Sequence, residues 1–133
     1  FSLSRGLGDV YKRQELYINS MKEQISYDQF DKIDLRIGTV ISVKKNEKAR
    51  KPSLVVKVDF GKEIGIKQSS AQITHYYNEE NLKNKQVIGV CNFAEKNIAG
   101  VVSQVLILGA IDQEGKVVLL HPSQKTEDGL PIA

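Results

Sequence analysis

Basic side chains are concentrated in one part of the sequence, and their chemistry suits the binding of anions. Five fall in one polar stretch, and three more occupy positions on neighbouring predicted strands that we expect to point outward. They are Lys44, Lys45, Lys48, Arg50 and Lys51 in the loop, and Arg36, Lys57 and Lys67 on the strands. Such groups pair with phosphates or with acidic segments of a protein. The pattern predicts a basic stripe beside a basic loop, although interspersed acids such as Glu47 and Asp59 also fit a solvated surface.

Catalytic and metal-binding chemistry has little support in the sequence. The two histidines, His75 and His121, are far apart, and neither has a cysteine or an acid at metal-ligand spacing. The single cysteine, Cys91, lies within a predicted strand, where a core thiol is expected rather than a nucleophile. We therefore expect no enzymatic activity, no metal and no cofactor. One cysteine cannot form an internal disulfide, which indicates a reducing, cytoplasmic setting.

Alternating apolar residues predict the strands that must position the basic groups. The residues expected to face the core are Leu35, Ile37, Thr39, Ile41 and Val43 in the first strand, and Leu54, Val56, Val58 and Phe60 in the second. A third strand is expected to begin at residues 64–66, and residues 86–93, 101–110 and 116–121 are further candidates. Short helices are expected at residues 26–30 and 78–82.

Five or so short strands with one helix between the third and the fourth fit an all-β fold. The architecture that this order favours is a five-stranded Greek-key barrel of the OB type, with a flanking terminal helix and C-terminal strands. The periodicity alone also allows an SH3-like barrel or a small sandwich. The 133 residues, 41% apolar and 26% charged, suit one globular domain. The net charge of +3 is too small for coating nucleic acid by charge alone, so any such contact must be local.

The first twenty residues differ from the rest of the chain. Residues 1–14 have neither the apolar core of a signal peptide nor a pattern that continues into residues 21–133, and they resemble a translation of sequencing-adaptor DNA. Met21 stands where a natural start is expected. We expect residues 1–20 to be a non-native or disordered segment and residues 21–133 to form the domain. No membrane insertion is expected, because the apolar runs are far shorter than the roughly 20 residues of a membrane span.

The stretch from Phe30 to Val40, FDKIDLRIGTV, resembles the first-strand signature of the tRNA-binding-domain superfamily. That superfamily includes an appendage of bacterial methionyl-tRNA synthetases, free-standing tRNA-binding proteins, and CsaA proteins, described as secretion-related chaperones. Three features favour the CsaA type: residues 49–52 followed by 58–61, residues 67–74, and residues 92–93 followed by 98–100 and 103–106. Synthetase-type relatives tend to carry a Ser-Gly pair after the third strand and a Met near Leu106, and this chain has neither. The resemblance covers residues 25–133.

The resemblance also implies which side of the barrel faces a ligand. Besides the basic groups on the strands, the side chains expected to bind a peptide or tRNA there are Ser69, Ser70, Gln72, Asn92, Lys96, Ser103 and Gln104. Hydroxyls and amides suit RNA edges, sugar hydroxyls or a peptide backbone equally well. Their alternative role is to cap loops and satisfy buried backbone groups.

By the same resemblance, we expect a homodimeric, cytoplasmic, export-related chaperone that binds unfolded or precursor polypeptides without ATP. The alternative is a tRNA-binding protein that recognises structured RNA through the barrel face, and a third hypothesis is an adaptor that docks another protein there. Proteins that read single strands usually offer aromatic platforms, and only Tyr76, Tyr77 and Phe93 are candidates here. The scarcity of aromatics counts against single-strand binding more than against structured RNA.

Overall fold

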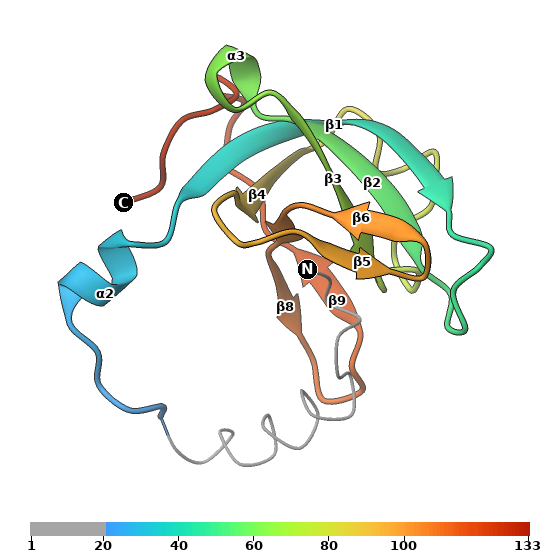
Figure 1. Ribbon diagram of the computed structural model, residues 1–133, viewed down its shortest axis with the longest axis horizontal. Helices are drawn as coiled ribbons and strands as arrows, with labels where there is room; N and C mark the ends of the chain where they lie inside the picture. Colours follow the sequence, from blue (N-terminus) through green and yellow to red (C-terminus); the bar gives the residue numbers. More distant parts are fainter. Residues whose placement is uncertain (1–20) are drawn as a thin grey trace.

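Antiparallel strands are the main regular secondary structure of the molecule (Figure 1). The computed structural model describes residues 21–133, and the expectation for residues 1–20 lies outside them. In chain order the elements are α2 (Tyr27–Asp31), β1 (Leu35–Lys45), β2 (Leu54–Asp59), α3 (Gly61–Ile64), β3 (Ile66–Ala71), β4 (Gln86–Val90), β5 (Lys96–Ile98), β6 (Val101–Ser103), β7 (Leu106–Ile107), β8 (Gly109–Ile111) and β9 (Val117–Leu119). One sheet has the order β3-β2-β1-β4-β7, while β5 pairs with β6 and β8 with β9.

The five-stranded sheet curls into a nearly closed antiparallel barrel, which confirms the predicted fold class. β7 returns beside β3, and the backbone N–H of Gln104 donates to the carbonyl of Gln68 across 2.8 Å. The strand boundaries differ from the prediction in two places. β3 begins at Ile66 because a helical turn, α3, precedes it, and residues 101–110 are divided among β6, β7 and β8.

β1 does not keep one face toward the core along its whole length. Its pairing with β2 shifts register between Val40 and Ser42, which marks a β-bulge. Val40 and Val43 belong to the core, whereas Leu35 and Ile37 are buried outside it. The predicted alternation of Leu35 and Ile37 against Arg36 and Gly38 holds before the bulge. Its continuation on the same side to Val43 was wrong, because one extra residue reverses the side on which every later residue lies.

The C-terminal segment pairs with the start of β1. The Ile37 N–H donates to the carbonyl of Leu130 (3.1 Å), and the Ile132 N–H donates to the carbonyl of Leu35 (2.9 Å). The segment thus pairs edge to edge with the start of β1, where β2 does not reach. Alternation within one strand cannot predict such a partner, because the pairing residues lie far away in the sequence.

Phe60 is the largest fully buried side chain of the core. The inward positions predicted for the second strand are all buried, namely Leu54, Val56, Val58 and Phe60. A Cβ atom on Gly38 or on Gly89 would lie 2.8 Å from the Phe60 ring. β1 and β4 therefore need glycine where they cross this ring.

The connection from β3 to β4 consists of turns, and the helix predicted at residues 78–82 is absent. The Asn78 side chain accepts hydrogen bonds from the N–H groups of Glu80 and Asn81, both 2.8 Å. Such local bonds from side chain to backbone compete with helix formation. Leu82 from this segment is nevertheless buried in the core, so the turns contribute to barrel packing.

The helix predicted near Ser26 is present as α2. The Ser26 hydroxyl accepts from the Gln29 N–H (3.2 Å), and the Gln29 side chain accepts from the Ser26 N–H (2.9 Å), which forms a capping box. No residue of α2 is buried, and the helix stands apart from the barrel (Figure 1). Among the described residues, no helix is long and apolar enough to cross a membrane.

Candidate functional site

The outward side of β1 and β2 presents exposed basic side chains. Lys57 lies opposite Ser42 of β1 and opposite Gln68 of β3. Residues opposite one another share a face of the sheet, and the neighbours of Lys57 along β2 face the core. Lys57 therefore points away from the barrel, as does Lys44, which lies two residues after Ser42 and beyond the bulge.

The β1–β2 loop continues this surface. We call Lys44, Lys45, Lys48, Arg50, Lys51 and Lys57 the basic face. All six side chains are exposed, and none forms an ion pair with another residue in the range 21–133. Residues 44–57 contain one acid, Glu47, so this segment carries +5 while the whole chain carries only +3. The positive charge is therefore local, and it is available to an external anion.

The β5–β6 hairpin borders the basic face. A Cβ atom on Gly100, in the turn of this hairpin, would lie 3.7 Å from Cδ of Lys48, so the hairpin and the β1–β2 loop are neighbours. The Gln68 side chain donates to the carbonyl of Val102 (2.9 Å) and holds the hairpin against β3. In barrels of this architecture, the face of the second and third strands and the two loops beside it form the oligonucleotide surface.

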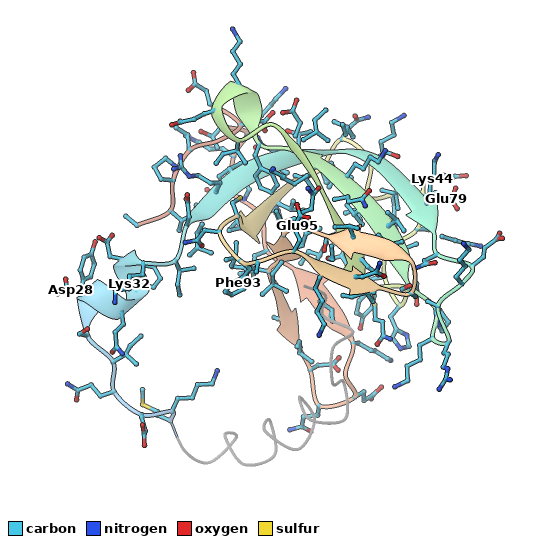
Figure 2. The ribbon with its side chains drawn as sticks, in the orientation of Figure 1. Asp28, Lys32, Lys44, Glu79, Phe93 and Glu95 are labelled. Atoms are coloured by element: carbon cyan, nitrogen blue, oxygen red, sulfur yellow. The ribbon has the colours of Figure 1, made fainter. Side chains whose placement is uncertain are left out.

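Two of the three aromatic candidates are accessible. Tyr76 is 49% exposed and Phe93 is 40% exposed, whereas the Tyr77 hydroxyl is engaged by the Leu119 N–H (2.8 Å). Figure 2 shows Phe93 on the segment that leads into β5, and Lys44 at the end of β1 away from α2. Many exposed cations are thus available for phosphates, but only two of the candidate rings are accessible for base stacking.

Arg36, Lys57 and Lys67 do not form the single basic stripe that we predicted. Lys67 pairs with Val58, a core residue, and thus lies on the barrel side of β3. Arg36 pairs with Gly89, whose Cβ position points at the core, so Arg36 also lies on the barrel side. The prediction failed because it did not include the bulge in β1 or the helical turn before β3.

Arg36 is engaged within the protein. Its Nε lies 2.6 Å from Asp34 Oδ1, and Nη1 donates to the carbonyl of Gly129 (3.0 Å). The hydrogen bond with Asp34 raises the pKa of Arg36 above its ordinary value. This guanidinium thus links the start of β1 to the C-terminal segment, which is a structural role.

Cys91 is half-buried and packs against the core. Burial, and to a lesser extent the nearby charge of Asp34, raises the pKa of its thiol to about 11. The thiol is therefore protonated and unreactive at neutral pH. Within residues 21–133, no group of three or more His, Cys, Asp or Glu side chains could hold a metal ion.

Four of the polar residues near β3 and β6 hold the barrel together. We call Gln68, Ser70, Ser103 and Gln104 the closure cluster. The Ser70 N–H donates to the Ser103 hydroxyl (3.1 Å), and the Gln68 N–H donates to Gln104 Oε1 (3.1 Å). The Gln104 amide also donates to Glu95 (3.0 Å). The sequence prediction had omitted Gln68, although its position opposite Lys57 in the strand pattern was a signal for it.

Asn92 joins the end of β4 to the segment before β1. Its amide donates to the carbonyl of Lys32 (2.8 Å), and its Oδ1 accepts from the Asp34 N–H (2.9 Å). These two bonds satisfy backbone groups that no strand partner reaches. The contact with a ligand that was predicted for Asn92 stays a prediction.

The remaining predicted residues are scattered around β3 and β5. Ser69 is buried, and Lys96 is half-buried opposite Ser103 in the hairpin. The hydroxyl of Ser70 and Oε1 of Gln72 are buried and have no hydrogen-bond partner among the described residues. The structure therefore brings together the loop cations and Lys57, but it does not bring all the predicted residues into one site.

Comparison with known protein families agrees with this geometry. Residues 35–131 match the family described as putative tRNA binding domain. The chain is 37% identical over 132 residues to a methionine–tRNA ligase of Pyrococcus furiosus, and 38% identical over 121 residues to that of Methanocaldococcus jannaschii. These matches cover 99% and 91% of this chain but 18% of each ligase. The chain thus spans less than a fifth of the length of these relatives.

Solved structures include several similar folds. The chaperone CsaA from Bacillus anthracis is 43% identical with a TM-score of 0.79, and the CsaA chaperone protein from Picrophilus torridus is 46% identical with a TM-score of 0.77. A MetRS related protein from Pyrococcus horikoshii is 28% identical with a TM-score of 0.75. The likeness covers 83–84% of this chain and 100% of each of these structures. The chain therefore belongs to the family of tRNA-binding domains, in the group of folds that includes CsaA chaperones and MetRS-related proteins.

Proposed function

We propose that this protein binds structured RNA of the tRNA type through the basic face. The observation that carries the proposal is the set of six exposed cations, which have no ion-pair partner among the described residues and border the barrel strands. Each cation that neutralises a phosphate releases counterions, which drives binding at low salt. The match to a tRNA-binding family supports the same class of ligand. The role is that of a binding module rather than an enzyme.

Fluorescence anisotropy of labelled tRNA with the full chain tests this proposal. If about six phosphates are contacted, the affinity should fall by about a thousandfold between roughly 50 and 200 mM salt. A matched oligodeoxynucleotide duplex serves as control, because charge alone would bind it equally well. The absence of binding at low salt, or binding that salt does not weaken, would contradict the proposal.

A second candidate is an export-related chaperone that holds unfolded or precursor polypeptides without ATP in the cytoplasm. The identity of 43% and 46% to CsaA chaperones, across their entire solved chains, favours it. Exposed apolar side chains such as Ile66 (56%) and Val118 (50%) offer contacts for an unfolded client. Light scattering of a denatured client at equimolar protein should show suppressed aggregation without nucleotide. Unchanged aggregation would exclude this candidate.

Both candidate functions fit a homodimer. α2 has a complete capping box and no buried residue, and Tyr27, Ile33 and Leu130 are exposed by 68%, 38% and 39%. A second copy would cover these apolar groups and double the binding surface. Sedimentation velocity at micromolar concentration should show a dimer that Tyr27→Ser together with Ile33→Ser dissociates. A monomer for the unaltered chain would refute this part of the proposal.

A further inference from the structure

Two neighbouring hollows beside the barrel share part of their lining, and we call the two together the groove. The wider hollow, about 680 Å³, lies between the middle of β1, the start of β4 and residues 121–128. The narrower hollow, about 400 Å³, lies between the β3–β4 turns and β9. Lys85, Gln86 and His121 line both. Volumes of a few hundred cubic ångströms are usual for small-ligand sites.

Hydrogen bonds fix the floor of the wider end. The Thr39 hydroxyl donates to Asp128 (2.6 Å), and the Gln86 side chain both donates to the carbonyl of Thr126 (2.7 Å) and accepts from its N–H (3.0 Å). These bonds attach the C-terminal segment to β1 and β4. This end of the groove is therefore formed before any ligand arrives, which lowers the entropic cost of binding.

The charges of the wider end lie at different depths. Lys85 and Lys125 are exposed and form no ion pair with another described residue. The lining acids, Asp128 and Asp59, are half-buried, and Asp59 accepts from the Gly61 N–H (2.9 Å). Two cations and two acids leave this end close to neutral, with hydrogen-bonding groups below and ammonium groups at the rim. Such a site suits a nucleotide: its neutral base and ribose would meet the hydrogen-bonding groups, and its flanking phosphates would meet the ammonium groups.

The narrower end has apolar walls and the ring of Tyr77 beside polar groups that include the imidazole of His121. Leu82 and Leu119 are buried in its wall, and Leu120 is 43% exposed. The Tyr77 hydroxyl accepts from the Leu119 N–H (2.8 Å), which holds the ring in place. A base gains affinity by stacking on a fixed ring. Tyr77 is the ring that a hydrogen bond holds in place here, and one such ring serves one base rather than a run of bases.

The groove adjoins the basic face. Asp59, in the lining of the wider end, lies two residues after Lys57 and pairs with Thr39 of β1. Two residues of a strand span roughly 6–7 Å, so an RNA backbone that crosses Lys57 passes the mouth of the groove. We infer, on the basis of the RNA binding proposed above, that the groove receives one unpaired nucleotide of an RNA held on the basic face.

Two hairpin RNAs with the same stem test this inference. One has a blunt end, and the other has a short single-stranded 3′ extension. The full chain should bind the extended hairpin about tenfold more tightly. Ser123 is exposed and lines the wider end, so Ser123→Phe should fill the groove and remove this gain while affinity for the blunt hairpin stays the same. Thr74→Phe, at an exposed position outside the groove, is the matched control and should keep the gain.

The possible results separate this inference from the proposed function. Equal affinity of the unaltered protein for the two hairpins, with tRNA still bound, overturns the inference and leaves the proposed function in place. If neither hairpin nor tRNA binds, both fail. A persistent gain in Ser123→Phe also overturns the inference. Competition by an unfolded polypeptide against the extended hairpin, but not against the blunt one, would assign the groove to polypeptides instead.

Discussion

The basic face and the closure cluster are two polar regions on one barrel, and the protein uses them in opposite ways. The cations of the basic face are exposed and form no ion pairs with other described residues. The side chains of Ser103 and Gln104 accept hydrogen bonds from backbone N–H groups of β3 and so close the barrel. A polar side chain with a buried backbone partner contributes to stability, whereas an exposed charge contributes little to stability and much to ligand attraction. Substitutions should therefore affect binding in one region and folding in the other.

The largest effect is expected from reversing charge on the basic face. Lys44→Glu combined with Lys57→Glu should weaken tRNA binding by about a hundredfold and reduce the slope of log affinity against log salt by about 2, because two phosphate contacts are lost. The melting temperature should change little. Lys62→Glu combined with Lys83→Glu reverses two exposed lysines outside the basic face and is the control. Equal loss in both double variants would show that only overall charge matters.

A smaller effect, on stability rather than binding, is expected in the closure cluster. Ser103→Ala leaves the buried Ser70 N–H without its hydroxyl partner, which should lower the free energy of unfolding by about 1–3 kcal/mol. Urea titration measures the change, and Ser123→Ala at an exposed position is the control. The folded variant should bind tRNA as before. A stable variant with impaired binding would instead make Ser103 a ligand contact.

Asn92 should give a weaker version of the same result. Asn92→Ala removes one bond to the Lys32 carbonyl and one from the Asp34 N–H. The expected loss is about 1 kcal/mol, because water can reach these exposed groups. Asn92→Asp keeps the acceptor for the Asp34 N–H but turns a carboxylate oxygen toward the Lys32 carbonyl, so it should lose at least as much. A smaller loss for Asn92→Asp than for Asn92→Ala would contradict this assignment.

The smallest effect on folding and binding at neutral pH is expected at Cys91, whose thiol has a pKa raised to about 11 in the folded protein from 9.0. At pH 8 its thiolate fraction should be about a hundredfold lower than in the unfolded chain, so a thiol reagent should react correspondingly slowly before urea is added. Because the folded state keeps its proton longer, the thiol's contribution to stability is complete below pH 9 and decreases as the pH rises to 11. Cys91→Ala should remove that part of the pH dependence. Equally fast labelling of folded and unfolded protein would disprove the shift.

Much of the barrel could be predicted from the sequence. The alternation of Leu54, Val56 and Val58 in β2 corresponds directly to burial, because that strand is regular and has one covered face. β1 was harder to predict, because a bulge changes the face on which its later residues lie and the C-terminal segment pairs with its start. These features depend on contacts between distant residues, which periodicity does not reveal.

The candidate site was partly predictable for a similar reason. The loop cations are accessible because they are charged and lie in a polar loop. Both properties can be recognised from the neighbouring residues in the sequence. The hydroxyls and amides looked equally suitable for a ligand, and only the cross-strand bonds of Ser103, Gln104 and Asn92 reveal their structural use. The groove was not predicted at all, because its walls come from β1, β4, β9 and the C-terminal segment.

The bulge in β1 has a consequence for how this domain tolerates insertions and deletions. Removal of Ile41 would pair Val40 and Ser42 with Val58 and Lys57 without interruption and would leave both flanks on their present faces. Loss or gain of one residue elsewhere in β1 would move one flank of the strand to the opposite face, which is incompatible with both the packing and the charge pattern. Length changes in β1 outside the bulge should therefore be selected against far more strongly than in the β1–β2 loop. Point substitution, rather than change of length, is the route by which related sequences can diversify this strand.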